Sequence, residues 1–171
     1  MTIKEIIELF EYNDRANDKF VQMISNAFGE ETDLTKCEDE RVIKIQMIAV
    51  HLFAGNALWR KRMEGEFPTS MLQSSDYPTP LSIKFAIGAE RARFCSFLEG
   101  IQNDESLNES VHYLNMVGES YHLHLKQILM HLFTHAIYHR GQMSSLLMEL
   151  GYSGLIESTD ISGFYLEKQS R

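Results

Sequence analysis

The sequence predicts an all-α fold, a four-helix bundle, and three observations lead to that prediction. Four long segments carry apolar residues at three- and four-residue steps, which is the period of a buried helix face. All three prolines fall between residues 66 and 81, where one long irregular connection is therefore expected. No segment alternates strongly enough to predict a substantial sheet. The length of 171 residues suits one domain, which we place at residues 1–171.

The first two helices are expected at residues 2–28 and 40–64. Thr2 is a favoured N-cap residue, and Gly29 follows the last apolar position, where glycine commonly ends a helix. Gly65 marks the end of the second helix in the same way. One side of this second helix carries Met47, Ile48, His51, Gly55 and Leu58.

The third helix is expected from Pro80 to about Leu98, because Thr79 is a favoured N-cap and proline is favoured in the first turn. The proline-containing connection before it is long enough for the second and third helices to lie parallel. Residues 101–119 are polar, and their alternating piece at 111–117 predicts a small hairpin or an extended loop.

The fourth helix has the clearest pattern and is expected from near Ser120 to the residue before Gly151. Its apolar positions are Leu125, Ile128, Leu129, Leu132, Ala136, Met143, Leu146, Leu147 and Leu150. After it, Asp160 is expected to cap a short tail helix at residues 161–166. Four amphipathic helices without a convincing sheet are typical of a bundle.

The composition argues against several classes of partner. The formal net charge is −8, and an acidic surface repels nucleic-acid phosphates and anionic lipids. The first residues lack the basic-then-apolar layout of a signal peptide, and no stretch approaches about 18 uncharged apolar residues. We therefore expect a cytoplasmic protein that acts on a small molecule and binds neither nucleic acid nor membrane.

Histidine is the one unusual count, because five of the seven histidines lie within residues 122–139. His135 and His139 are four residues apart on the apolar side of the fourth helix, so they lie about 5–6 Å apart on one face. Two imidazoles there can bind one metal ion at about 2.0–2.1 Å. His51 interrupts the apolar stripe of the second helix and is the candidate third ligand, since bundle cofactor sites are built from facing helices.

His131 leaves the spacing argument with two alternatives. Positions 131, 135 and 139 form a row whose ends are about 12 Å apart, so one ion cannot bind both ends. The ligand pair is either His131 with His135 or His135 with His139. The competing interpretation is that these are ordinary histidines whose hydrogen bonds are satisfied without a metal. His122 and His124 are expected to be exposed near the start of the fourth helix.

Other polar residues are candidates for a pocket beside the metal. Arg140 could meet a substrate anion or form a surface ion pair. Gln142, one turn from Tyr138, could orient a ligand or face water. The sequence does not identify a general base, and the remaining pocket candidates are Asp160, Glu119 and Tyr121.

His131, His135 and His139 lie in a run that resembles the motif of a known family. The segment HLFTHAIYHRGQ, from His131 to Gln142 and followed by Glu149-Leu-Gly, is similar to the C-terminal signature of the DinB/YfiT-like superfamily. Residues 12–17 (YNDRAN) resemble the opening helix of that family, and residues 51–59 (HLFAGNALW) resemble its second-helix motif. Residues 111–118 and 160–165 also fit. The resemblance covers nearly the whole chain, and its most specific part is the His-Arg-Gly-Gln run.

The resemblance implies a bundle of up-down-down-up order, usually a homodimer, with three histidines that bind a divalent metal such as nickel or zinc. Carried over by motif, the ligands are His51, His135 and His139. His131 occupies a position that is often histidine but is not a ligand in the family. Members similar to this chain include metal-dependent transferases and isomerases that use low-molecular-weight thiols, so a thiol cosubstrate is also implied.

We therefore expect a metal-dependent enzyme that acts on a small molecule, with thiol transfer favoured over hydrolysis. Three neutral imidazoles leave coordination positions open, as in catalytic metal sites. A metal there can hold a thiol as the reactive thiolate, or lower the pKa of water to about 7. The alternatives are a non-catalytic, metal-binding stress-response homodimer and a metal-dependent hydrolase.

Overall fold

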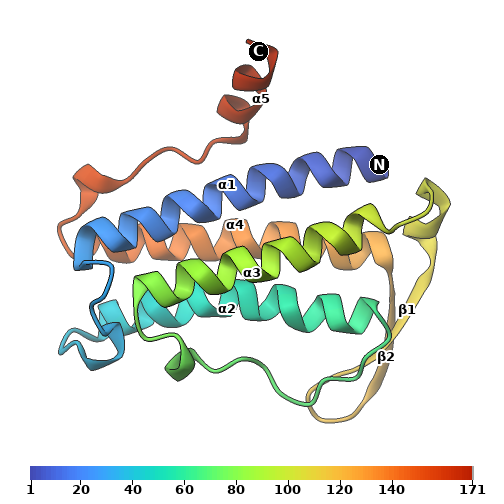
Figure 1. Cartoon of the computed structure of the whole chain (residues 1–171), viewed down its shortest axis with the longest axis horizontal. Coiled ribbons are helices and arrows are strands. Elements are labelled where there is room, and N and C mark those ends of the chain that lie inside the picture. The colour runs from blue at the N-terminus through green and yellow to red at the C-terminus, as the bar shows by residue number, and fades with distance from the viewer. Residues whose placement is uncertain (171) are drawn as a thin grey trace.

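The computed structural model describes residues 1–170 and is mostly helical (Figure 1). Its long helices are α1 (Ile3–Phe28), α2 (Glu40–Met63), α3 (Pro80–Glu99) and α4 (Leu125–Glu149). The four lie side by side, and α2 and α3 run in one direction while α1 and α4 run in the other (Figure 1). A short helix, α5 (Ile161–Gln169), ends the described chain. The prediction of a mainly helical fold is confirmed.

Capping residues set the helix ends that the sequence predicts. The Thr2 side chain accepts a hydrogen bond from the Glu5 backbone N–H at 3.2 Å, and the Glu5 carboxylate accepts one from the Thr2 N–H at 2.7 Å. Thr79 and Ser82 form the same reciprocal pair at the start of α3, with Pro80 in the first turn. Gly29, with φ of +91°, ends α1 as expected.

The core lies between the four long helices. Helix α1 packs against α3 and α4, and α2 packs against the same two helices from the other side. The most deeply buried side chains include Ile24, Ile45, Ile83, Ile128, Leu132, Met143 and Leu147. Each such side chain contributes about 1.5–3 kcal/mol when it is fully buried, so packing stabilises these helices more than intrinsic propensity does.

A two-stranded sheet replaces part of the predicted fourth helix. Strand β1 (Ser110–Leu114) pairs antiparallel with β2 (Ser120–His124), so the hairpin alternative for residues 111–117 is confirmed. The prediction that the helix begins near Ser120 is wrong, because residues 120–124 are held in the strand by their pairing with β1. His122 and His124 are exposed as expected, but they lie on β2 and not on a helix.

The long connection between α2 and α3 returns along the length of the helices (Figure 1), which allows these two helices to run parallel. Gln46, which is fully buried in α2, holds this connection in place. Its side-chain Nε2 donates to the carbonyl oxygens of Ser74 at 2.7 Å and Tyr77 at 2.8 Å. The segment before Ser74 is thereby kept beside α2.

Within residues 1–170, one helix is long and apolar enough to cross a membrane by length and composition, and this helix is α2. The other helices cover it, since 67% of its most apolar window is buried. A central helix of a helical core passes the same test for this reason.

Candidate metal centre

Three histidines from two facing helices meet at one point of the core. His51 of α2 and His139 of α4 each place the ring atom Nε2 at 3.0 Å from Nε2 of His135. The three candidate ligand atoms all lie within 4.8 Å of one another, and all three side chains are half-buried. The predicted residues are therefore brought together by the packing of α2 against α4.

The contacts between these rings suit a cation better than a proton. Each neutral imidazole has one N–H, so Nε2 of His135 can share a hydrogen with only one of its two Nε2 neighbours. Nitrogen atoms that bind one metal at about 2.0–2.1 Å are about 2.9–3.4 Å apart at the usual coordination angles. The two 3.0 Å separations fall within that range. These two separations therefore fit imidazole ligands of one divalent transition metal, and the third nitrogen lies within 4.8 Å of the others.

Gln142 fixes the orientation of one of these rings. Its side-chain oxygen accepts a hydrogen bond from Nδ1 of His139 at 2.7 Å, which leaves the Nε2 lone pair of His139 directed at His135. The Gln142 Nε2 group donates in turn to the Tyr138 hydroxyl at 3.1 Å. Tyr138 itself is 63% exposed. Gln142 therefore contacts a candidate ligand directly and does not simply face water.

The surroundings keep two of the rings neutral, which is the form that binds metal. Burial, reinforced by the neighbouring His139, His51 and His131, lowers the pKa of His135 to about 4. Burial and the proximity of His139 also lower the pKa of His51. Neither ring therefore competes strongly for protons at neutral pH.

His131 lies one turn from this cluster and outside it. Its ring centroid is 5.4 Å from that of His135 and 5.7 Å from that of Trp59, and its side chain is exposed. Nε2 of His135 is directed instead at His51 and His139. Of the two pairs that spacing left open, the structure groups His135 with His139.

A hollow of about 410 Å³ opens beside His51 and His139. We call it the histidine-side pocket, and its walls are mainly apolar, with Met47, Ile48, Val50, Ala54, Met71 and Leu72 among the lining residues. Lys44 is the one cationic residue among those that line it. The long connection supplies one wall, which Gln46 holds in place. Sequence reasoning missed Gln46 and this wall, because a buried amide within an apolar run gives no periodic signal.

Other predicted pocket residues lie elsewhere. Arg140 is only 3% exposed, and its Nη1 donates to the side-chain oxygens of Asn13 at 2.5 Å and Asn17 at 2.8 Å. It therefore faces α1, so the surface ion pair predicted as one alternative is wrong, and Arg140 does not line the histidine-side pocket. Asp160 caps α5 by accepting from the Ser162 N–H at 2.9 Å.

Asp160 also lines a separate hollow between α1 and the tail. Glu119 and Tyr121 lie in the hairpin, where the tyrosine hydroxyl donates to the carboxylate at 3.0 Å. Their position follows from the strand pairing of residues 120–124, which replaces the predicted helix start. None of these three residues lines the histidine-side pocket.

Comparison with known proteins identifies the family of this chain. A family model described as the DinB family matches residues 1–160. The chain belongs to the DinB family. The crystal structure of a DinB-like protein from Bacillus cereus ATCC 10987 matches with a TM-score of 0.57 and 22% sequence identity, over 88% of this chain and 93% of that chain. At this identity the likeness shows the fold. Among curated proteins, none matches this DinB family member.

Proposed function

We propose that this DinB family member is a metal-dependent enzyme that transfers a low-molecular-weight thiol to a small electrophile. His51, His135 and His139 would hold one divalent transition metal, nickel or zinc, within an up-down-down-up four-helix bundle. The observation that carries the proposal is the convergence of three half-buried imidazoles, two of which, His51 and His139, line an apolar pocket. A closed structural site would surround the metal with four protein ligands.

The residues beside the histidines support thiol chemistry on an apolar substrate. When bound, the metal supplies a Lewis acid that favours the thiolate form of a thiol. Met47, Ile48 and Leu72 provide an apolar surface against which the electrophile can lie. Among the lining residues there is no aspartate or glutamate to act as a general base for water. This absence favours thiol transfer over the hydrolytic alternative.

We also propose that the protein works as a homodimer through the outer face of α4. Met130, Ile137 and Met148 are exposed at helical spacing along this face. A side chain added at Gly141, on the same face, would meet no atom within 4 Å in this chain. A second copy could therefore approach closely there. Light scattering should give twice the chain mass of 19.8 kDa, and Ile137→Glu should reduce it to a single chain.

The enzymatic proposal is tested with protein loaded separately with nickel, zinc or manganese. Each form is supplied with a panel of low-molecular-weight thiols and an epoxide or a haloarene. We expect thiol consumption above the metal-free control for at least one combination, and loss of that activity in His135→Ala. Turnover that needs no thiol would favour the hydrolase. If no combination exceeds the control and the variant behaves like the native protein, the non-catalytic dimer is favoured.

A further inference from the structure

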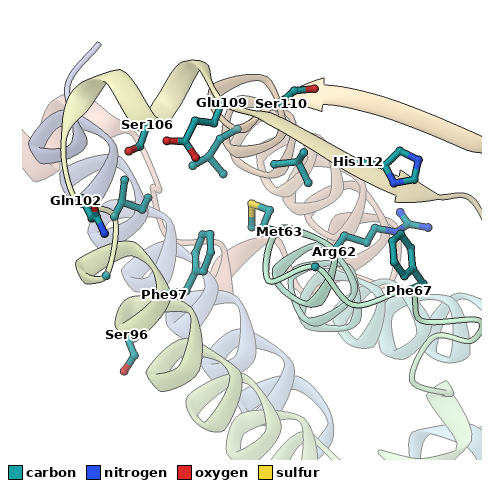
Figure 2. Close-up of a pocket in the computed structure, with 15 residues that line it drawn as sticks. Arg62, Met63, Phe67, Ser96, Phe97, Gln102, Ser106, Glu109, Ser110 and His112 are labelled. Carbon is teal, nitrogen blue, oxygen red and sulfur yellow. The ribbon is translucent and has the colours of Figure 1, made fainter.

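A further hollow lies at the end of the helical core where the hairpin packs (Figure 2), and none of the three candidate metal ligands lines it. Its volume is about 690 Å³, and we call it the end pocket. The C-terminal ends of α2 and α3, the residues after α3, strand β1 and the first residue of α4 line it. Arg62, in its wall, lies eleven positions after His51 on α2. At 1.5 Å per residue, the two residues are about 16 Å apart along the helix.

Arg62 is the unusual residue of this pocket, because it is a cation that is 5% exposed. Its Nη2 donates to the Leu114 carbonyl oxygen at 3.0 Å, whereas its Nε has no hydrogen-bond partner. Within residues 1–170, no carboxylate oxygen lies within 4.0 Å of its guanidinium. Buried arginines are normally paired with an acidic group.

Two aromatic rings hold the guanidinium in place but do not neutralise it. Its central carbon lies 4.8 Å from the ring centre of Trp59 and 5.0 Å from that of Tyr113. These cation–π contacts explain how Arg62 fastens β1 to α2. Burial lowers the pKa of Arg62. The fastening role alone leaves this charge without an acidic partner, and the unpartnered Nε is itself covered by protein atoms.

The rest of the end pocket suits one acidic group on an apolar body. Arg62 lies at one end, beside His112 and Phe67, whereas Glu109 lies at the other end (Figure 2). Met63 and Phe97 lie between them (Figure 2), and Leu125 is a further apolar residue of the lining. The carboxylate of Glu109 would repel a second acidic group, so a ligand should carry its negative charge at the Arg62 end only.

We propose that the end pocket binds a small organic anion, whose carboxylate, sulfonate or phosphate group meets Arg62 and whose apolar body lies along Met63, Phe97 and Leu125. This site is independent of the metal centre and of the proposed enzymatic reaction. The anion would supply the missing partner of a desolvated guanidinium, which is among the stronger polar contacts in proteins. The apolar floor would bury the remainder of the ligand.

The test uses two fluorescent probes of nearly the same shape. 1-Anilinonaphthalene-8-sulfonate carries a sulfonate, and N-phenyl-1-naphthylamine is the same body without it. For the native full-length protein we expect saturable binding of the sulfonate, about tenfold or more tighter than the uncharged probe. Arg62→Met should remove that difference. Lys61→Met, which removes an exposed neighbouring charge that does not line the pocket, should preserve it.

Two further measurements locate the bound probe and guard against misfolding of the Arg62 variant. Methyl NMR should show the sulfonate shifting the signal of Met63 in the end pocket, and leaving that of Met47 in the histidine-side pocket unchanged. Ser110→Trp, at an exposed position of β1 that lines the end pocket, should block both probes and leave Arg62 in place. His135→Ala should bind both probes like the native protein, which separates this proposal from the metal centre.

Equal affinity of the native protein for the two probes would overturn the proposal. Undiminished sulfonate binding in both Arg62→Met and Ser110→Trp would also overturn it. An NMR shift confined to Met47 would place the probe in the histidine-side pocket. That result would also overturn the proposal.

Discussion

His139 and Arg140 are adjacent in the sequence, yet they belong to two polar clusters on different sides of α4. On the α1 side, an arginine donor meets the amide oxygens of Asn13 and Asn17. On the α2 side, the Nε2 atoms of three histidines meet one another. The first contact joins donors to acceptors and holds two helices together. The second brings three like groups together, and we propose that a divalent cation completes it. Burial of a polar cluster alone therefore does not show whether the cluster holds two helices together or binds a ligand.

Single substitutions test whether the two clusters act separately. The largest expected effect is on metal affinity. His139→Ala should weaken zinc binding by more than about 100-fold, since it removes a ligand and loss of an outer hydrogen-bond partner alone costs about 10–100-fold. The affinity is measured by competition with a chromogenic chelator. The matched change on the other side, Arg140→Met, should retain native affinity. A comparable loss of affinity in both variants would show that the two clusters are not separate.

The second effect is on stability, where Arg140→Met should cost more than His139→Ala. Arg140→Met leaves the buried oxygens of Asn13 and Asn17 without their donor. It should lower the free energy of unfolding of the metal-free protein by about 2–3 kcal/mol, as measured in urea. His139→Ala in the same metal-free state should cost less, because it relieves a contact between like groups. Equal stability of native protein and Arg140→Met would remove the structural role assigned to the α1 side.

Gln142 should show a smaller effect on the metal side. Gln142→Leu removes the group that accepts from Nδ1 of His139 but leaves all three rings. Zinc affinity should fall by about 10-fold, and at most about 100-fold, with no change in stoichiometry. Gln142→Glu retains an acceptor and serves as the control, with affinity close to native or higher. Native affinity in Gln142→Leu would show that packing alone orients His139.

The smallest effect should come from Asp14 on the α1 side. Burial raises the pKa of Asp14 to about 6, against the lowering influence of Arg91. The folded state then binds more protons than the unfolded state between about pH 4 and pH 6, so this group lowers stability as pH rises through that window. The stability of Asp14→Asn relative to native protein should therefore increase from pH 4 to pH 7, by on the order of 1 kcal/mol. A constant difference across this range would contradict the shift.

Much of the fold follows from local signals in the sequence. The caps at Thr2 and Thr79 and the apolar period placed α1 and α3 within a residue or two. The start of α4 at Leu125 was mispredicted, because residues 120–124 fit either a helix start or a strand, and only pairing with a distant segment decides between them.

The site was predictable where spacing or motif identified it, and not where a contact depends on packing. The i,i+4 spacing indicated a histidine pair, whereas the choice between His131 and His139 needed the family motif or the position of α2. Arg140 and Gln46 were not predictable in the same way. Their partners lie on α1 and on the long connection, and the sequence alone does not show that these segments lie beside them.

The most direct test of the metal centre is a cobalt titration followed by visible absorption. Co²⁺ reports both the stoichiometry of binding and the coordination geometry, and it accepts the same imidazole ligands as zinc. We predict that native protein and His131→Ala each saturate at one equivalent with the same spectrum, and that His51→Ala, His135→Ala and His139→Ala each lose it. An unchanged spectrum in His135→Ala, or loss of the spectrum in His131→Ala alone, would contradict the three-histidine site.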